Sequence, residues 1–140
     1  MKPIYFVSVD DVETQVLEWG TFQWMNEPRV TGAQKQILGL GKIEPGFGHT
    51  RHNHPDSEEF IYFLSGNCHQ TLEVETEGGK LYEKDMTGGE MIYIPQGWYH
   101  STVNTGTGTL TFLCCYLNAG TELAIYEQAI KILPPKNPRD

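Results

Sequence analysis

The sequence predicts an all-β domain that closes into a barrel, with one short helix near the C-terminus. Short runs rich in aromatic and β-branched residues recur along the chain, for example at residues 60–64 and 91–94. Turn-forming residues accompany these runs, as in Pro55-Asp56-Ser57 and Pro95-Gln96-Gly97. Apolar residues at helical spacing appear near the end of the chain, over residues 121–133. Strands separated by tight turns are therefore expected to make up most of the fold.

The predicted strands follow one another at short intervals. In chain order they cover residues 4–7, 19–24, 34–43, 58–64, 68–75, 91–94 and 109–117, with a further strand that begins near His100. The aromatic run 19–24 is either a strand or a wall over the mouth of the barrel, and residues 10–19 show no clear pattern. Gly39 and Gly41 lie inside a strand, where a missing side chain indicates a bulge or a close approach of another group. Residues 77–80, Glu-Gly-Gly-Lys, are predicted to form a hairpin turn.

One helix is predicted after the last strand. Its apolar residues at helical spacing are Leu123, Tyr126, Ile130 and Leu133. Thr121 is a candidate N-cap because its hydroxyl can accept a hydrogen bond from the first turn. Pro134 and Pro135 follow directly and are expected to end the helix.

Length and composition predict one globular domain that spans residues 1–140. Hydrophobic residues make up 39% of the chain and aromatic residues 11%, which is enough for a buried core. The net charge of −8 argues against nucleic acid and anionic membranes as partners, because both would repel an acidic protein. No stretch has the form of a signal peptide or of a membrane span. The three cysteines, two of them adjacent at 114 and 115, are expected to be free thiols in a reducing cytoplasm.

Two histidines and a pair of glutamates flank the first turn. His52 and His54 are two residues apart, and in a strand such residues point to the same face. The strand that follows residues 55–57 is expected to pair with the histidine segment around this turn. It would then place a glutamate, Glu58 or Glu59, opposite the two histidines.

His100 follows the second turn and would bring a third imidazole from another part of the sheet. Neutral imidazole suits zinc, copper, iron and nickel, and a carboxylate extends the choice to manganese. Three imidazoles and one carboxylate fill four positions, which leaves an octahedral ion two for water, oxygen or substrate. Simpler explanations are a surface histidine pair, a solvated glutamate pair and a polar loop cap at His100. The adjoining turns and strands favour the metal site.

The two segments resemble the two sequence motifs of the cupin superfamily. The first motif is G, five residues, H, one residue, H, three or four residues, E, six residues and G; the second is G, five residues, P, one residue, G, two residues, H, three residues and N. The matching residues are Gly46, His52, His54, Glu59 and Gly66 in residues 46–66, and Gly89, Pro95, Gly97, His100 and Asn104 in residues 89–104. The resemblance implies a double-stranded β-helix, or jelly roll, as the fold of a single cupin domain. It also selects Glu59 over Glu58 as the carboxylate ligand. One divalent ion, Fe, Mn, Zn or Ni, would then be bound by His52, His54, Glu59 and His100.

The resemblance further implies an enzyme that uses this ion on a small organic molecule, with dioxygenase, isomerase or lyase chemistry. It leaves the reaction open, because this fold hosts many chemistries. His49 and Tyr99 are candidates for proton transfer beside the metal. The aromatic residues available to line a substrate pocket are Phe47, Phe63, Tyr93, Trp98 and Tyr99. The alternative is a non-catalytic module that holds a small ligand or a metal ion without turnover.

Strand alternation assigns the neighbours of Glu59 to two faces. Ile61 and Phe63 are expected on the metal side, and Phe60 and Tyr62 on the outside. An outer face with aromatic side chains needs a cover, and the expected cover is a second copy of the chain in a homodimer. The helix or the N-terminal segment is the alternative cover.

Overall fold

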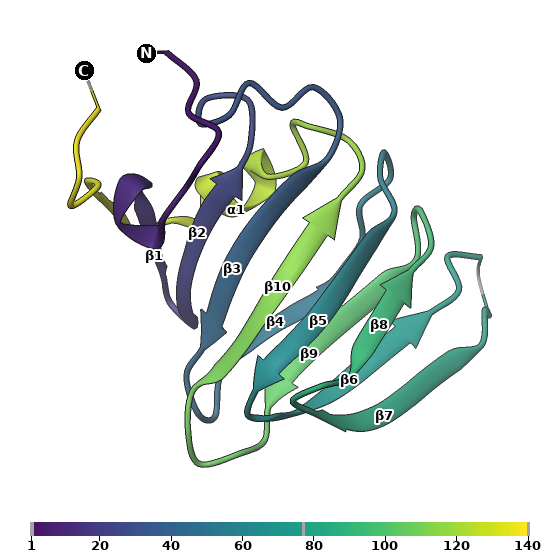
Figure 1. Cartoon of the computed structure of the whole chain (residues 1–140). Helices are drawn as coiled ribbons and strands as arrows, with labels where there is room; N and C mark the ends of the chain where they lie inside the picture. Colours follow the sequence, from purple (N-terminus) through teal and green to yellow (C-terminus); the bar gives the residue numbers. More distant parts are fainter. Residues whose placement is uncertain (1, 77, 140) are drawn as a thin grey trace.

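The fold consists of two antiparallel β-sheets that face each other across a common core (Figure 1). The computed structural model describes residues 2–76 and 78–139. The first sheet has seven strands, in the order β11 (Lys131–Leu133), β1 (Thr14–Leu17), β2 (Gly20–Asn26), β3 (Ile37–Ile43), β10 (Leu110–Tyr116), β5 (Glu59–Ser65) and β8 (Met91–Ile94). The second sheet has four strands, in the order β4 (Gly48–His52), β9 (Tyr99–Asn104), β6 (Asn67–Glu73) and β7 (Leu81–Thr87). This architecture confirms the predicted all-β jelly roll.

Two short helical segments accompany the sheets. A single 3-10 turn, η1 (Val9–Asp11), precedes β1, and the Ser8 hydroxyl caps it by accepting a hydrogen bond from the Asp10 backbone N–H. The helix α1 (Leu123–Gln128) follows β10 and lies behind β2 and β3 in the view of Figure 1. It buries Ile125 in the core between the sheets. The predicted C-terminal helix is therefore present.

The helix is shorter than the sequence predicts, and its second half was assigned wrongly. It ends at Gln128, and residues 131–133 form β11, which pairs with β1. Glu122, not Thr121, occupies the N-cap position, and no side chain caps the helix there. The edge of β1 offers backbone hydrogen-bonding groups to this segment, and such a tertiary partner outweighs the local helical spacing.

The prediction of the first strand was also wrong. Residues 4–7 form no strand; Tyr5 and Phe6 lie in a bend, and their side chains are exposed. The first strand is instead β1, which lies within the stretch that showed no clear pattern and pairs with β2. Aromatic and β-branched composition favours a strand only where a neighbouring strand can complete its hydrogen bonds.

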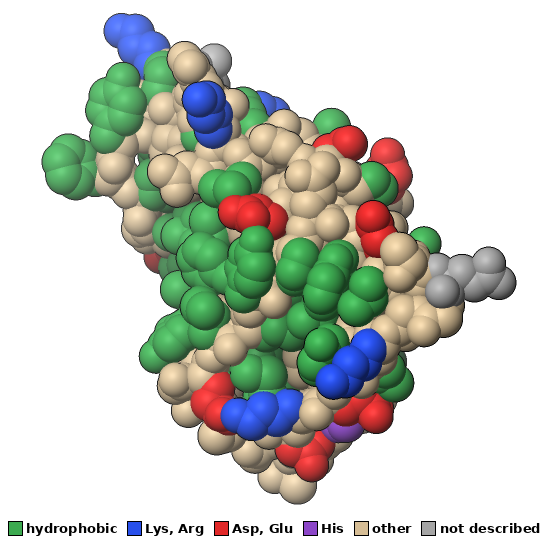
Figure 2. Space-filling view, turned by 90° about the vertical axis from the view of Figure 1, so that its right-hand side faces the viewer, with side chains coloured by type: hydrophobic (Ala, Val, Ile, Leu, Met, Phe, Trp, Pro, Cys, Tyr) green, Lys and Arg blue, Asp and Glu red, His purple; other side chains and the backbone are tan. Residues whose placement is uncertain are grey.

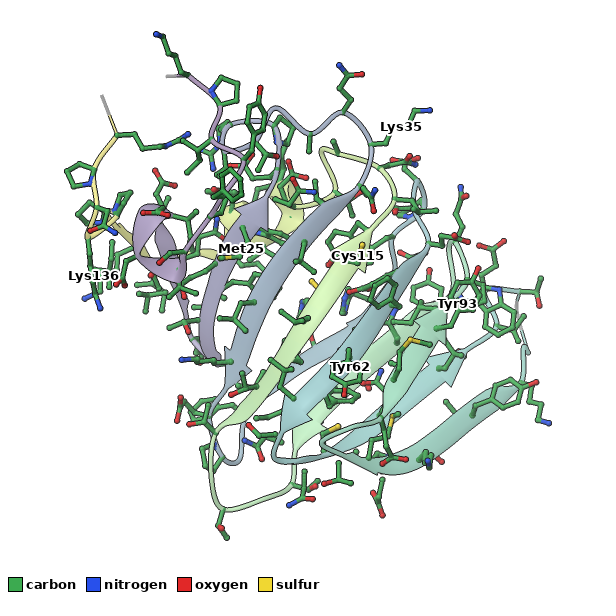
Figure 3. All side chains as sticks on the ribbon, in the orientation of Figure 1. Met25, Lys35, Tyr62, Tyr93, Cys115 and Lys136 are labelled. Atoms are coloured by element: carbon green, nitrogen blue, oxygen red, sulfur yellow. The ribbon has the colours of Figure 1, made fainter. Side chains whose placement is uncertain are left out.

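The side chains of β5 alternate between the core and the outside, as predicted. Glu59, Ile61 and Phe63 are buried, whereas Phe60 and Tyr62 are 39% and 38% exposed. Figure 3 shows Tyr62 on β5 and Tyr93 on β8 at the outer face of the seven-stranded sheet. Neither α1 nor the N-terminal segment covers this outer face, so the alternative cover within the chain is absent from the described structure.

Close approaches explain the two glycines of β3. A Cβ atom on Gly39 would lie 2.2 Å from the Phe22 ring and 2.7 Å from the Trp24 ring. A Cβ atom on Gly41 would lie 2.3 Å from the Phe112 ring. The large aromatic side chains of the neighbouring strands therefore pack directly on a backbone that lacks side chains.

The expected pairing of the two strands around residues 55–57 was wrong. β4 pairs with β9 in the four-stranded sheet, whereas β5 lies between β10 and β8 in the seven-stranded sheet. The intervening segment thus crosses from one sheet to the other. This crossing places His52 and Glu59 on facing sheets rather than on neighbouring strands, so their side chains meet across the interior.

Two further sequence expectations concern the rest of the chain. The predicted turn at residues 77–80 includes residue 77, which lies outside the described residues; β6 and β7 on either side of it pair as antiparallel neighbours. Among the residues described, no helix has the length and apolar character needed to cross a membrane. The cysteines Cys68, Cys114 and Cys115 are free, as expected.

Candidate metal centre

His52 and His100 lie directly opposite each other on the paired strands β4 and β9, with ring centroids 4.2 Å apart. The Nδ1 atom of His52 is 2.6 Å from the backbone oxygen of Thr50, and Nδ1 of His100 is 3.1 Å from that of Trp98. A carbonyl oxygen only accepts hydrogen bonds, so each Nδ1 carries the proton and donates it. The lone pair of each Nε2 is then available to a metal ion, as in most histidine ligands.

His54 lies beyond the end of β4 and is positioned by the turn at residues 95–97, which belongs to the second motif. The backbone N–H of Gly97 donates to the His54 carbonyl at 3.1 Å, and the Asn53 amide donates to the Gly97 carbonyl at 3.0 Å. The side chain of Gln96 donates to the Pro55 carbonyl at 2.8 Å. The turns at residues 53–55 and 96–97 therefore hydrogen-bond to each other, and this contact brings His54 beside His100.

Glu59 completes the cluster from the opposite sheet. Its Oε1 atom lies 3.4 Å from Nε2 of His54 and 3.1 Å from Nε2 of His100. All three atoms are buried, and none has a hydrogen-bonding partner of acceptable geometry. Ligand atoms of His52, His54 and His100 also lie within 4.8 Å of one another. Buried polar atoms normally have partners, so this convergence of unpartnered donor atoms fits a divalent metal ion.

The ionisation of the cluster also suits metal binding. Burial lowers the pKa of His52 to about 2 and that of His49 to about 4, with neighbouring imidazoles contributing to the shift. Burial alone would raise the pKa of Glu59, but the adjacent imidazoles of His100 and His54 outweigh it and lower that pKa to about 2. His52 is thus neutral and Glu59 ionised, which are the states that a metal ligand requires.

The neighbours Glu58 and Asn104 have structural contacts. Glu58 faces outward, where its carboxylate accepts a hydrogen bond from the Tyr93 hydroxyl at 2.5 Å. Asn104 is buried at the end of β9 and donates to the backbone oxygens of Ile43 and Gly108 at 2.8 and 2.9 Å. It joins β9 to the loops at this end of the barrel and lies away from the metal cluster.

A cavity of about 20 Å³ adjoins the cluster. It is lined by Phe22, Ile43, His49, His52, Glu59, Ile61, His100, Thr102, Phe112, Cys114, Tyr116 and Ile125. Phe112, Cys114 and Tyr116 were missed by sequence reasoning, although alternation places them on one face of β10. What the sequence could not supply is the register that sets Tyr116 opposite Glu59 and Cys114 opposite Ile61.

The aromatic residues that the sequence suggested for the pocket lie elsewhere. Phe63 is in the core, Trp98 packs against the core, and Phe47 and Tyr93 are exposed. Tyr99 faces the opposite side of β9 from His100. None of these five side chains lines the cavity beside the metal cluster.

The two candidates for proton transfer therefore differ in position. The His49 ring stacks between Trp19 and His52, with centroid distances of 5.0 and 3.8 Å, and it lines the cavity. The Tyr99 ring lies under the Arg51 guanidinium, 3.8 Å from its carbon, on the outer side of β9. The structure brings His49 to the cluster and does not bring Tyr99 there.

The fold and the convergent histidines are those of a cupin. The family model described as Cupin domain matches residues 39–116, which is more than half of the chain. The chain therefore belongs to the cupin family. Its three-histidine group could hold a metal ion.

Curated relatives match between half and about seven tenths of the chain. It is 29% identical over 100 residues to the protein SchB of Streptomyces halstedii, covering 71% of this chain and 67% of SchB. It is 34% identical over 83 residues to a glucose-6-phosphate isomerase of Thermococcus kodakarensis, covering 57% and 43%. It is 33% identical over 70 residues to the polyketide synthase CurC of Streptomyces cyaneus, covering 50% and 46%. The chain thus spans less than half the length of the last two relatives.

Solved structures of oxalate decarboxylases have the same fold. The Bacillus subtilis enzyme superimposes with a TM-score of 0.68 at 20% identity, covering 86% of this chain and 29% of that chain. The Lactobacillus farciminis enzyme superimposes with a TM-score of 0.70 at 22% identity, covering 88% and 33%. At this level of identity the likeness shows the fold alone.

Proposed function

We propose that this chain is a mononuclear metalloenzyme that acts on a small organic molecule. The observation that carries the proposal is the set of buried, unpartnered atoms Nε2 of His54, Nε2 of His100 and Oε1 of Glu59, which converge with His52. Leaving such groups without partners costs free energy, and a bound ion would satisfy them together. The ligands in this proposal are His52, His54, Glu59 and His100.

The ion and the residues around it would have three separate roles in catalysis: polarising the substrate, transferring a proton and excluding water. The ion, when bound, would act as a Lewis acid that polarises a substrate oxygen. His49 is neutral at pH 7, since burial lowers its pKa to about 4, and its ring faces the cavity where it can accept a proton transiently. Apolar walls such as Phe22 and Ile61 would exclude water from the reacting atoms.

The reaction class and the metal are proposals that rest on chemistry and on relatives. Three imidazoles and one carboxylate accept Fe, Mn, Zn or Ni. Relatives are described as glucose-6-phosphate isomerases and as a probable oxalate decarboxylase, which supports isomerase or lyase chemistry. The Bacillus subtilis oxalate decarboxylase contains Mn(II) centers, which supports manganese. Dioxygenase chemistry fits the same ligand set.

A non-catalytic binding module is the second candidate. The small volume of the cavity, about 20 Å³, favours it, since so small a site could hold a metal ion or one small ligand but leaves little room for a substrate. Turnover of any substrate by the metal-loaded protein separates the two candidates.

Metal analysis tests the proposal directly. Protein purified without chelator should contain about one divalent ion per chain, and His52→Ala or His100→Ala should lose most of it. His69→Ala is the matched control, because His69 is a half-exposed histidine on β6 that pairs with Asp85 and Glu83. Stoichiometric metal in a His52→Ala, His54→Ala double variant would refute the ligand assignment. Oxygen uptake by the Fe-loaded protein then separates dioxygenase from isomerase and lyase chemistry.

We further propose that the chain forms a homodimer in a reducing cytoplasm. Figure 2 shows apolar side chains gathered on the face that carries β5, β7 and β8. Its exposed apolar residues are Phe60, Tyr62, Leu64, Leu81, Tyr82, Met91 and Tyr93. A second copy would cover these residues and the open edge of β8. The free cysteines support the reducing compartment.

A further inference from the structure

The walls of the cavity beside the metal cluster are mostly apolar. Apart from the proposed ligands, they consist of the aliphatic and aromatic side chains of Phe22, Ile43, Ile61, Phe112 and Ile125, with His49, Thr102, Cys114 and Tyr116. The Thr102 hydroxyl is already occupied, because it donates to Oε1 of Gln70 at 2.5 Å. Few polar groups therefore remain for a substrate, apart from His49 and the Tyr116 phenol.

None of the described residues that line this cavity is a lysine or an arginine. Arg51 lies on the same strand as His49, but its side chain points to the outer face of the sheet. There its guanidinium donates to the Glu73 carboxylate at 2.9 and 3.1 Å. The metal ion would pair with the oxygens that it binds, but the remaining charged oxygens of a phosphate or a dicarboxylate would meet apolar walls without a side-chain cation, and such burial of charge is costly. The walls thus disfavour the sugar phosphate and the oxalate that the relatives' names suggest.

The cavity is also small. Its volume of about 20 Å³ holds roughly one water molecule. Ile125 is 2% exposed and is the residue by which α1 reaches the cavity wall. Leu123, Ala124 and Glu127 of the same helix line an open surface hollow of about 470 Å³ together with residues 53–56. Ile125 therefore lies between the metal cavity and the surface.

Two features distinguish α1 from the rest of this wall. The helix has only six residues and its N-cap, Glu122, provides no side-chain hydrogen bond to the first turn. Gly120, just before it, has a φ of +108°, a backbone conformation that side chains rarely adopt. The other walls belong to strands that are hydrogen-bonded to neighbouring strands, whereas α1 is attached to the barrel through its side chains.

We propose that the site takes a small molecule with a pair of oxygen donors on an uncharged, apolar body, and that Ile125 determines the size of that body. The oxygen pair would face the metal, and the body would pack against Phe22, Phe112 and Ile125. This inference rests on the proposed metal centre. It is independent of the reaction, because it concerns only which molecules bind.

Binding to the zinc-loaded protein tests the inference without redox chemistry. The zinc content is measured first, and then 4-nitrocatechol, oxalate and glucose 6-phosphate are titrated by calorimetry, with the catechol absorbance as a second readout. The nitrocatechol dissociation constant should be at least about tenfold lower than those of oxalate and glucose 6-phosphate, because its aromatic ring packs on the apolar walls, whereas the other two place charged or hydroxyl groups against them. Stoichiometric zinc with equal or tighter binding of oxalate or glucose 6-phosphate would overturn the inference and leave the metal centre intact. Wild-type protein that binds no zinc would overturn the metal centre and this inference with it.

Variants at position 125 test the role of the helix. Ile125→Ala should bind the bulkier 2,3-dihydroxynaphthalene about tenfold more tightly than the wild type, and Ile125→Phe should weaken nitrocatechol binding by a similar factor. Ile125→Val removes a single methylene and should give an intermediate gain even if the alanine variant is poorly folded. Leu123→Ala is the matched control, since Leu123 is an exposed residue of the same helix. Equal affinities across the Ile125 series at full zinc occupancy would refute the assignment.

Discussion

Acidification of the metal-free protein from pH 7.5 to pH 5.5 should lower its free energy of unfolding by about 3 kcal/mol. Burial lowers the pKa of His49 to about 4 and that of His52 to about 2, so both imidazoles remain neutral in the folded protein over this range. In the unfolded chain both return to the ordinary histidine pKa of about 6.5 and take up protons. The unfolded state therefore binds more protons than the folded state, and stability must fall as the pH falls.

The magnitude follows from these two histidines. Each contributes about 1.4 kcal/mol over the two pH units, because its unfolded form titrates in this window and its folded form does not. Glu59 acts in the same direction, but its pKa is lowered from 4.5 to about 2, so its contribution is lost only at lower pH. His69 acts in the opposite direction, because hydrogen bonds to Asp85 and Glu83 raise its pKa. It is exposed to solvent, so its effect is small.

Urea unfolding at pH 7.5, 6.5 and 5.5 in the presence of a chelator measures this dependence. His49→Gln and His52→Gln should each remove about half of the pH-dependent loss. His69→Gln is the control on the outer face and should leave the loss intact or increase it slightly. A free energy of unfolding that stays constant in the wild type across this range would show that the two imidazoles are solvated and would refute the argument.

Three further predictions concern single positions. Glu59→Gln should weaken metal binding, measured by competition with a chromophoric chelator, far more than Glu58→Gln, because only Glu59 faces the histidines; equal losses would contradict the assignment. Gly39→Ala should cost about 1–3 kcal/mol in urea unfolding because its Cβ would collide with two aromatic rings, whereas Gly108→Ala, with open space around it, should be nearly neutral. Sedimentation at micromolar concentration should show a dimer that Tyr62→Glu dissociates, and a wild-type species at the monomer mass of 15.9 kDa would exclude the dimer.

The strand-rich fold could be predicted because its signals are local. The period of two along β5 assigns Phe60 and Tyr62 to the outside and Ile61 to the inside, and the structure agrees. Turn-forming residues at 55–57 and 95–97 separate the strands as expected. The extent of the C-terminal helix was not predictable in the same way, since residues 131–133 satisfy a helical spacing locally but find hydrogen-bonding partners on β1.

The walls of the cavity could not be predicted because they depend on which strands become neighbours. Phe112 and Tyr116 are ordinary strand residues in the sequence, and only the pairing of β10 with β5 places Tyr116 opposite Glu59. The sequence around Ile125 showed helical spacing, but nothing in it indicated which part of the barrel the helix would pack against. Contacts between segments that are far apart in sequence carry this information, and periodicity does not contain it.

The geometry of the ligand cluster follows from hydrogen bonds that do not involve a metal ion. The turns at residues 53–55 and 96–97 bind each other through backbone groups and the amide side chains of Asn53 and Gln96. The rings of His52 and His100 are oriented by hydrogen bonds from Nδ1 to the backbone carbonyls of Thr50 and Trp98. An ion that enters such a site meets ligands already in place, so little ordering entropy is lost on binding. The motif glycine Gly97 contributes to the same arrangement, because its φ of +83° allows the tight turn whose N–H holds the His54 carbonyl. The motif residues that bind no metal therefore position those that do.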